Sequence, residues 1–335
     1  MSYTKQLLSG SAYFFAGSLL AAILAYGTKL ILVRNLSVED YGLFFAVLTF
    51  VLFFGVFKTL GLSRGLARFI AEYKVDRKYN EIKSILAGSF LMQLAASLVL
   101  VVLFWIAADF LAARYFQDPR AATLLKILAF YLPLEVVYVW SSAVFQGFKR
   151  QKLFSSTQTA MNLFIFVGVL AGLYYGLEIF APVIGYLGTF VVFFLIFAIP
   201  LYRTFDFFSF KYKDFLQENK KLLFFSIPLT ITAIGGTMLV YVDTLTLTFF
   251  DSLQNVGVYN IVYPTAFMVV MIGTSLGYML LPIVAELWSL GKKNEVSSAL
   301  KLLNTYVFVL ALPLIIFLMV FAKEIILLLF GPEYV

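Results

Sequence analysis

Apolar residues in this chain gather into nine long runs, each close to the ~20 residues that a helix needs to cross a ~30 Å hydrocarbon core. Within each run the apolar side chains would cover all faces of a helix, which is typical of helices surrounded by lipid. We expect spans at residues 11–33, 42–60, 84–108, 124–148, 157–177, 182–202, 222–249, 257–281 and 302–322. The pattern therefore predicts an all-α, polytopic membrane protein.

Basic residues are divided unevenly between the loops that join these spans. The loops on the N-terminal side carry 18 of the 25 lysines and arginines, whereas the opposite loops carry only Arg34, Arg114, Arg120 and Lys323. Because cytoplasmic loops are enriched in basic residues, we expect a multi-pass protein of the cell membrane with its N-terminus in the cytoplasm. The net charge of +7 then reflects orientation and attraction to anionic membrane lipids, and does not indicate a nucleic-acid partner.

The amino-acid composition also excludes several kinds of catalytic and metal-binding chemistry. The chain has no cysteine and no histidine, so disulfides, thiol catalysis and the commonest proton shuttle and metal ligand are excluded. We find no Walker motif, no metal-ligand spacing and no Ser-His-Asp set. We therefore expect no cofactor, no metal and no enzymatic activity. A membrane glycosyltransferase or polymerase stays a less favoured alternative, because its paired carboxylates in a sizeable polar loop are not visible.

Two basic connections are longer than the others, at residues 61–83 and 203–221. The second interleaves aromatic residues with lysines, as in Phe210, Lys211, Tyr212 and Lys213. This combination favours the headgroup boundary of a bilayer. We expect both segments to be helical or amphipathic extensions at the membrane surface.

The chain contains an internal repeat. An offset of 215 residues aligns Ser37 with Ser252 and Gly42 with Gly257, and so places the first span on the seventh. Six spans separate the copies, so both would cross the membrane in the same direction, as in two-lobed transporters. We expect a six-helix lobe at 1–205 and three helices of an incomplete second lobe at 206–335. The chain would then be the N-terminal part of a protein with roughly twelve or more spans.

Short segments around the spans resemble those of a known family. They are LSVEDYG at 36–42, FQGFKR at 145–150, FGPEY at 330–334, and SIPL at 226–229 with YVD at 241–243. In this order and spacing they resemble the polysaccharide transporter family, which holds the O-antigen and exopolysaccharide flippases of the multidrug/oligosaccharidyl-lipid/polysaccharide exporter superfamily. The resemblance implies two six-helix lobes that flip a polyprenyl-pyrophosphate-linked glycan by alternating access. Other polysaccharide-assembly proteins are further expected partners.

Ionisable residues inside the spans are candidate functional residues, because a charge at the bilayer centre costs at least ~2.5 kcal/mol on insertion scales. Lys29 lies in the outer half of the first span, where it is suited to a pyrophosphate or to snorkelling toward headgroups. Arg34 follows at the outer mouth and either joins Lys29 or binds lipid phosphate.

Two carboxylates are candidates for gating or ion coupling. Asp243 lies near the repeat equivalent of Lys29, so facing lobes would place the two residues opposite each other, as a salt bridge released by an anionic substrate. A coupling-ion site or a hydrogen bond to a neighbouring threonine are the alternatives. Glu135 lies mid-span after Pro133, where it would serve proton coupling or remain a protonated hydrogen-bond partner.

At the cytoplasmic side, Lys58, Arg64 and Arg68 follow the second span and would receive the pyrophosphate, with ordinary inside-positive anchoring as the alternative. Asn260 in the eighth span is a candidate contact for sugar hydroxyls, although helix-to-helix hydrogen bonding explains it equally. The sequence thus predicts a flippase. A cation-coupled small-molecule or drug antiporter of the same superfamily is the alternative, and a cationic cavity would favour the flippase.

Overall fold

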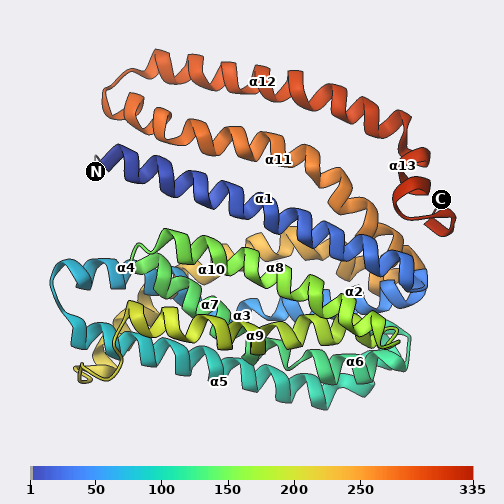
Figure 1. The fold of residues 1–335 in the computed structure, drawn as a ribbon, viewed down its shortest axis with the longest axis horizontal. Coiled ribbons are helices and arrows are strands. Elements are labelled where there is room, and N and C mark those ends of the chain that lie inside the picture. Colours follow the sequence, from blue (N-terminus) through green and yellow to red (C-terminus); the bar gives the residue numbers. More distant parts are fainter. Residues whose placement is uncertain (1–2, 335) are drawn as a thin grey trace. The chain divides into compact units, whose positions relative to one another are not determined.

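A computed structural model describes residues 3–334, with side chains from residue 17 onward except at a group of positions between 268 and 286. It contains two compact units, residues Met1–Gly257 and Val258–Val335, each described by itself below. All regular elements in the described residues are helices (Figure 1), which confirms the all-α prediction. The main helices are α1 (Tyr3–Asn35), α2 (Val38–Phe54), α3 (Val56–Thr59), α4 (Leu62–Val75), α5 (Tyr79–Leu111), α6 (Arg120–Leu128), α7 (Tyr131–Gly147), α8 (Gln151–Tyr174), α9 (Phe180–Thr204), α10 (Phe215–Phe250), α11 (Leu253–Ser289), α12 (Lys293–Val320) and α13 (Ala322–Leu329). Two short turns complete the list, the π-helical η1 (Ala112–Phe116) and the 3₁₀ η2 (Pro332–Tyr334).

Eight helices or runs of consecutive helices in the described residues are long and apolar enough to cross a membrane. They correspond to eight of the predicted spans and confirm a polytopic membrane protein. The remaining predicted span, 257–281, is helical as part of α11, but many of its side chains lie outside the described residues. The predicted lobe boundary at 205/206 stays a prediction; α10, which follows it, packs on α2, α4 and α5 within the first unit.

The second span does not end where hydropathy predicts. It breaks at Leu60 and Gly61, which both adopt left-handed backbone conformations (φ 46° and 64°), and then continues as α4. A Cβ on Gly61 would lie 2.4 Å from the backbone oxygen of Ser226 on α10, so the crossing requires glycine. The helical part of the first long connection is therefore confirmed, and its position at the membrane surface stays a prediction. α4 buries Leu62 and Leu66 against neighbouring helices and exposes Arg64 and Arg68.

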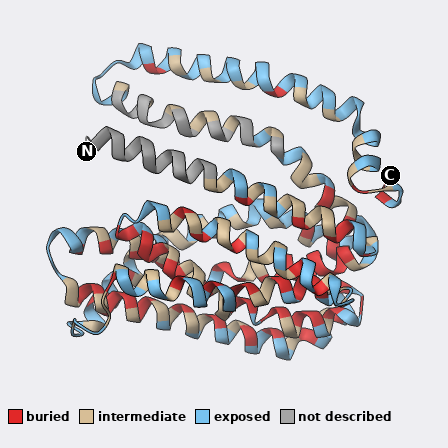
Figure 2. Cartoon of the chain, in the orientation of Figure 1, coloured by how far each residue is buried: buried red, intermediate tan, exposed pale blue. Residues whose placement is uncertain are grey.

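The second long connection, between α9 and α10, also packs on the protein. Phe205 is buried in a core cluster with Trp140, and the ring of Phe210 stacks on Tyr79 with centroids 5.1 Å apart. Phe208 and Tyr212 are exposed exceptions. Buried residues concentrate in the first unit (Figure 2), and Phe207 and Phe210 pack against its core cluster beside Phe205.

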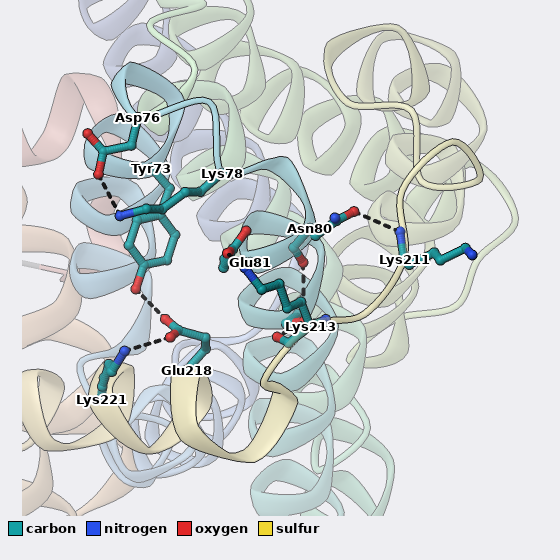
Figure 3. A network of polar contacts seen from close by, with 10 residues as sticks. Tyr73, Asp76, Lys78, Asn80, Glu81, Lys211, Lys213, Glu218 and Lys221 are labelled. Carbon is teal, nitrogen blue, oxygen red and sulfur yellow. Dashed lines mark hydrogen bonds and ion pairs between the residues drawn. The ribbon is translucent and has the colours of Figure 1, made fainter.

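A network of polar contacts fastens the start of α10 to α4 and α5 (Figure 3). Tyr73 of α4 and Lys221 both donate hydrogen bonds to the buried carboxylate of Glu218. Lys213, just before α10, donates to Glu81 of α5 at 2.8 Å. These contacts join segments that are 132 to 145 residues apart in sequence, so they fix the connection between α9 and α10 to the first unit.

Candidate functional site

The interior of the first unit contains a buried ion pair. The ammonium of Lys58, on α3, donates a hydrogen bond to the carboxylate of Glu135 on α7. Only 2% of the Lys58 side chain and 19% of the Glu135 side chain are exposed. Glu135 lies near the middle of the candidate span Arg120–Gly147, so the pair lies well inside the helical bundle. Lys58 is thus not at the basic mouth of the second span, where sequence analysis placed it.

Both residues of the pair lie beside a break in their span. Lys58 is followed within three residues by the left-handed pair Leu60 and Gly61. Glu135 lies just over one turn inside α7, whose start is separated from α6 by a turn at Ala129 and Phe130. The ion pair therefore joins two spans next to their interruptions.

Several tyrosines lie near Glu135. Tyr131 and Tyr138 of α7 and Tyr241 of α10 lie within electrostatic reach of Glu135. Tyr186 of α9 completes the set, with its ring centroid 6.4 Å from that of Tyr131. Within the described part of the chain, none of the four hydroxyls makes a hydrogen bond. Three phenol groups from two helices, with Tyr186 next to one of them, thus provide hydrogen-bond donors and acceptors within electrostatic reach of Glu135.

A buried ion pair contributes little net stability compared with apolar residues of the same size, so stability alone does not explain this one. Removing one partner of a buried ion pair typically costs about 3–5 kcal/mol, whereas replacing both by apolar residues is often neutral or stabilising. An intramembrane charge pair is therefore a functional-site candidate by default. The pair places one cation and one carboxylate together inside the candidate spans.

The predicted residues nearer the mouths have other surroundings. The Lys29 ammonium lies 4.9 Å from the ring centre of Phe45 on α2, a cation–π contact. Arg34 lies exposed near the end of α1. Asp243 is exposed on α10, and its proposed salt bridge with Lys29 stays a prediction.

On α4, Arg64 and Arg68 are exposed one turn apart, beyond the break that follows Lys58. The Arg68 guanidinium lies 4.3 Å from the ring centre of Phe225 on α10, and its nitrogen is 4.0 Å from the Glu72 carboxylate. Asn260 belongs to the second unit, near the start of α11, and its role stays a prediction.

Sequence comparison then identifies the family. The family described as polysaccharide biosynthesis protein matches residues 7–288 of the chain. This chain belongs to the polysaccharide biosynthesis protein family. The match confirms the resemblance found from the short segments around the spans. It also supports, in general terms, a membrane transporter related to polysaccharides.

Individual relatives agree with membership of the polysaccharide biosynthesis protein family. An uncharacterized membrane protein of Methanocaldococcus jannaschii is 28% identical over 348 aligned positions, which cover 100% of this chain and 69% of that protein. A solved structure of a protein named only "protein A" superposes with a TM-score of 0.56 at 16% identity, covering 97% of this chain and 74% of its own. At this identity the structural likeness supports the fold alone.

Proposed function

We propose that this protein flips a polyprenyl-pyrophosphate-linked oligosaccharide across the cell membrane by alternating access, with its basic loops in the cytoplasm. The observation that carries the proposal is the buried Lys58–Glu135 pair, which lies inside the helical bundle with three tyrosines within electrostatic reach of Glu135. Membership of the polysaccharide biosynthesis protein family supports the substrate class. A prenyl chain would stay in lipid while its charged headgroup crosses through the protein.

In this proposal the pyrophosphate competes with Glu135 for Lys58. Phosphate oxygens carry more negative charge than one carboxylate, so they are strong partners for the ammonium in a site of low dielectric. Glu135 is then left without its cation, and a proton on its carboxylate lowers the cost of its burial. Substrate binding and proton uptake would thus be linked through one residue.

The basic residues toward the mouths would guide the headgroup. Arg64 and Arg68 are exposed on α4 and would accept the pyrophosphate from the cytoplasmic leaflet. Lys29 and Arg34 would receive it toward the outer mouth, with Asp243 competing for Lys29 in the closed state. Asn260 would contact sugar hydroxyls. Membrane lipids and other polysaccharide-assembly proteins are the remaining expected partners.

The test is flipping of a labelled polyprenyl-pyrophosphate oligosaccharide in liposomes by the full-length protein. We expect Lys58→Met and Glu135→Gln to abolish flipping. The matched control is Lys292→Met, which disrupts an exposed ion pair with Glu295 and should leave flipping unchanged. Unchanged flipping by folded Lys58→Met protein would contradict the proposed site.

A cation-coupled antiporter is the second candidate, because a buried carboxylate with aromatic rings nearby also suits an organic cation. The two functions differ in the ligand that displaces the internal ion pair. An anionic lipid headgroup binds Lys58, so Lys58→Met removes its binding. A cation binds Glu135, so Lys58→Met would leave its binding intact or tighten it, and that result would favour the antiporter.

A further inference from the structure

The first turns of α2 and α11 meet with their backbones in direct contact. A Cβ on Gly42 would lie 1.9 Å from the carbonyl oxygen of Leu253 and 3.0 Å from the backbone nitrogen of Gly257. A Cβ on Gly257 would lie 2.5 Å from the carbonyl oxygen of Val38. Real Cβ atoms do not approach this closely, so the crossing exists only because both positions are glycine.

This contact joins residues that the internal repeat makes equivalent. An offset of 215 places Val38 on Leu253 and Gly42 on Gly257. Gly42 therefore meets the equivalent of Val38, and Gly257 meets Val38 itself, which is the reciprocal pattern of a two-fold interface. An ordinary helix crossing has no reason to pair equivalent positions of a repeat.

The two helix starts are also built alike. The hydroxyl of Ser37 accepts a hydrogen bond from the backbone N–H of Asp40 at 3.1 Å. Its equivalent, Ser252, accepts one from the N–H of Asn255 at 3.3 Å. Each serine side chain satisfies a backbone donor of the first turn, so both turns hold a defined shape at the contact. The surfaces that meet are thus matched and rigid.

Further contacts close the same end of the first unit. The Tyr115 hydroxyl donates to the backbone oxygen of Leu245 on α10 at 2.8 Å. Arg120 binds Glu39 and Asp40 in the first turn of α2, each at 2.7 Å. This end carries few basic residues, so in the proposed orientation it faces the outside.

We propose that the Gly42–Gly257 crossing is the outer gate of the transporter, closed in this structure, and that it parts when the protein opens outward. The inference rests on the proposed alternating access. Two rigid, matched helix starts in backbone contact form a two-state element, because packed surfaces separate or close as units and do not deform continuously. The absence of side chains on the two glycines makes the contact sensitive to a single added methyl group.

The test uses a cysteine probe behind the gate. Residues 1–335 contain no cysteine, so Thr49→Cys introduces a single thiol in this part of the protein, and full-length protein without this substitution gives the background labelling. Thr49 is 5% exposed and lies seven residues, about two turns, beyond Gly42 on the same face of α2. A membrane-impermeant maleimide is added to intact cells that express the full-length protein. We expect little labelling of Thr49→Cys alone and severalfold more labelling when Gly42→Ala is added, because the methyl group prevents closure.

A second variant and a matched control complete the design. Gly257→Ala meets a less severe clash and should raise labelling in the same direction, even where Gly42→Ala reduces folded protein. Gly235→Ala is the control, because a Cβ on Gly235 of α10 has nothing within 4 Å. Labelling that stays at the control level in folded Gly257→Ala protein would overturn the gate. Labelling measures the accessibility of the thiol at position 49 and needs no substrate. Increased labelling in a protein that flips no lipid-linked glycan would therefore overturn the proposed substrate and support the gate.

Discussion

Lys58 and Glu135 form an ion pair although 77 residues separate them in the chain. α3 and α7 bring them together inside the first unit, each beside a break in its span. Neither partner alone would be stable there, because a buried charge without a counter-ion is costly. The pair therefore holds two interrupted spans against each other. In the proposed mechanism, its lysine is also the cation that the pyrophosphate binds.

Stability measurements should separate these two roles. We expect Lys58→Met and Glu135→Gln to lower the free energy of unfolding, the lysine variant by about 3–5 kcal/mol since it leaves a buried carboxylate unpaired. The double variant Lys58→Met/Glu135→Leu should recover much of this loss, yet remain inactive in flipping. Thermal unfolding in detergent provides the comparison. A double variant as unstable as the worse single variant would show that the two residues are not coupled.

The tyrosine hydroxyls should matter for transport more than for stability. Tyr131→Phe keeps the ring that packs edge-on against Phe190, with centroids 4.9 Å apart, and removes only the hydroxyl. Because that hydroxyl has no hydrogen-bond partner within the described residues, its removal should change the unfolding temperature little. We expect slower flipping, measured as the initial rate in liposomes. An unchanged rate in both Tyr131→Phe and Tyr138→Phe would exclude the hydroxyls from the substrate path.

The sequence predicts the spans well because lipid contact requires long apolar helices, and this requirement acts locally along the chain. It does not predict the Lys58–Glu135 pair. The polar residues Ser63 and Arg64 after the break make hydropathy fall, which is typical of a loop, whereas α4 continues with one face buried. Burial of that face depends on neighbours that hydropathy cannot identify.

The tyrosines illustrate the same limit. The chain has 20 tyrosines, and nothing in their local sequence distinguishes the four near Glu135. The glycines are different, because the repeat already paired Gly42 with Gly257 from sequence alone. Physical proximity of equivalent positions could not be predicted, since a repeat defines equivalence and not contact.

The polar network at the start of α10 should contribute to stability. Glu218→Ala would leave the Tyr73 hydroxyl without its acceptor, and an unsatisfied buried polar group costs ~1–3 kcal/mol. Lys292→Ala, at an exposed ion pair, should cost less than about 1 kcal/mol. Apparent unfolding temperatures of both variants in detergent provide the measurement. Equal effects of the two substitutions would mean that the network does not hold the connection between α9 and α10 in place.

Acid should weaken the contacts that close the other end of the first unit. Burial of Asp118 opposes its charge, but hydrogen bonds from the Arg120 side chain and backbone outweigh this effect and lower the pKa of the carboxyl group below its usual value. A pKa that is lower in the folded than in the unfolded state means that the unfolded chain binds the proton more tightly. The stability from Asp118 is thus complete above its unfolded pKa of about 3.9 and is lost as the pH falls through the lower folded value.

We therefore expect Asp118→Asn to be less stable than the natural protein at pH 7, with the difference shrinking below about pH 4. Unfolding temperatures recorded from about pH 7 to about pH 3 measure it, and a difference that stays constant over this range would show that Arg120 does not depend on the charge of Asp118.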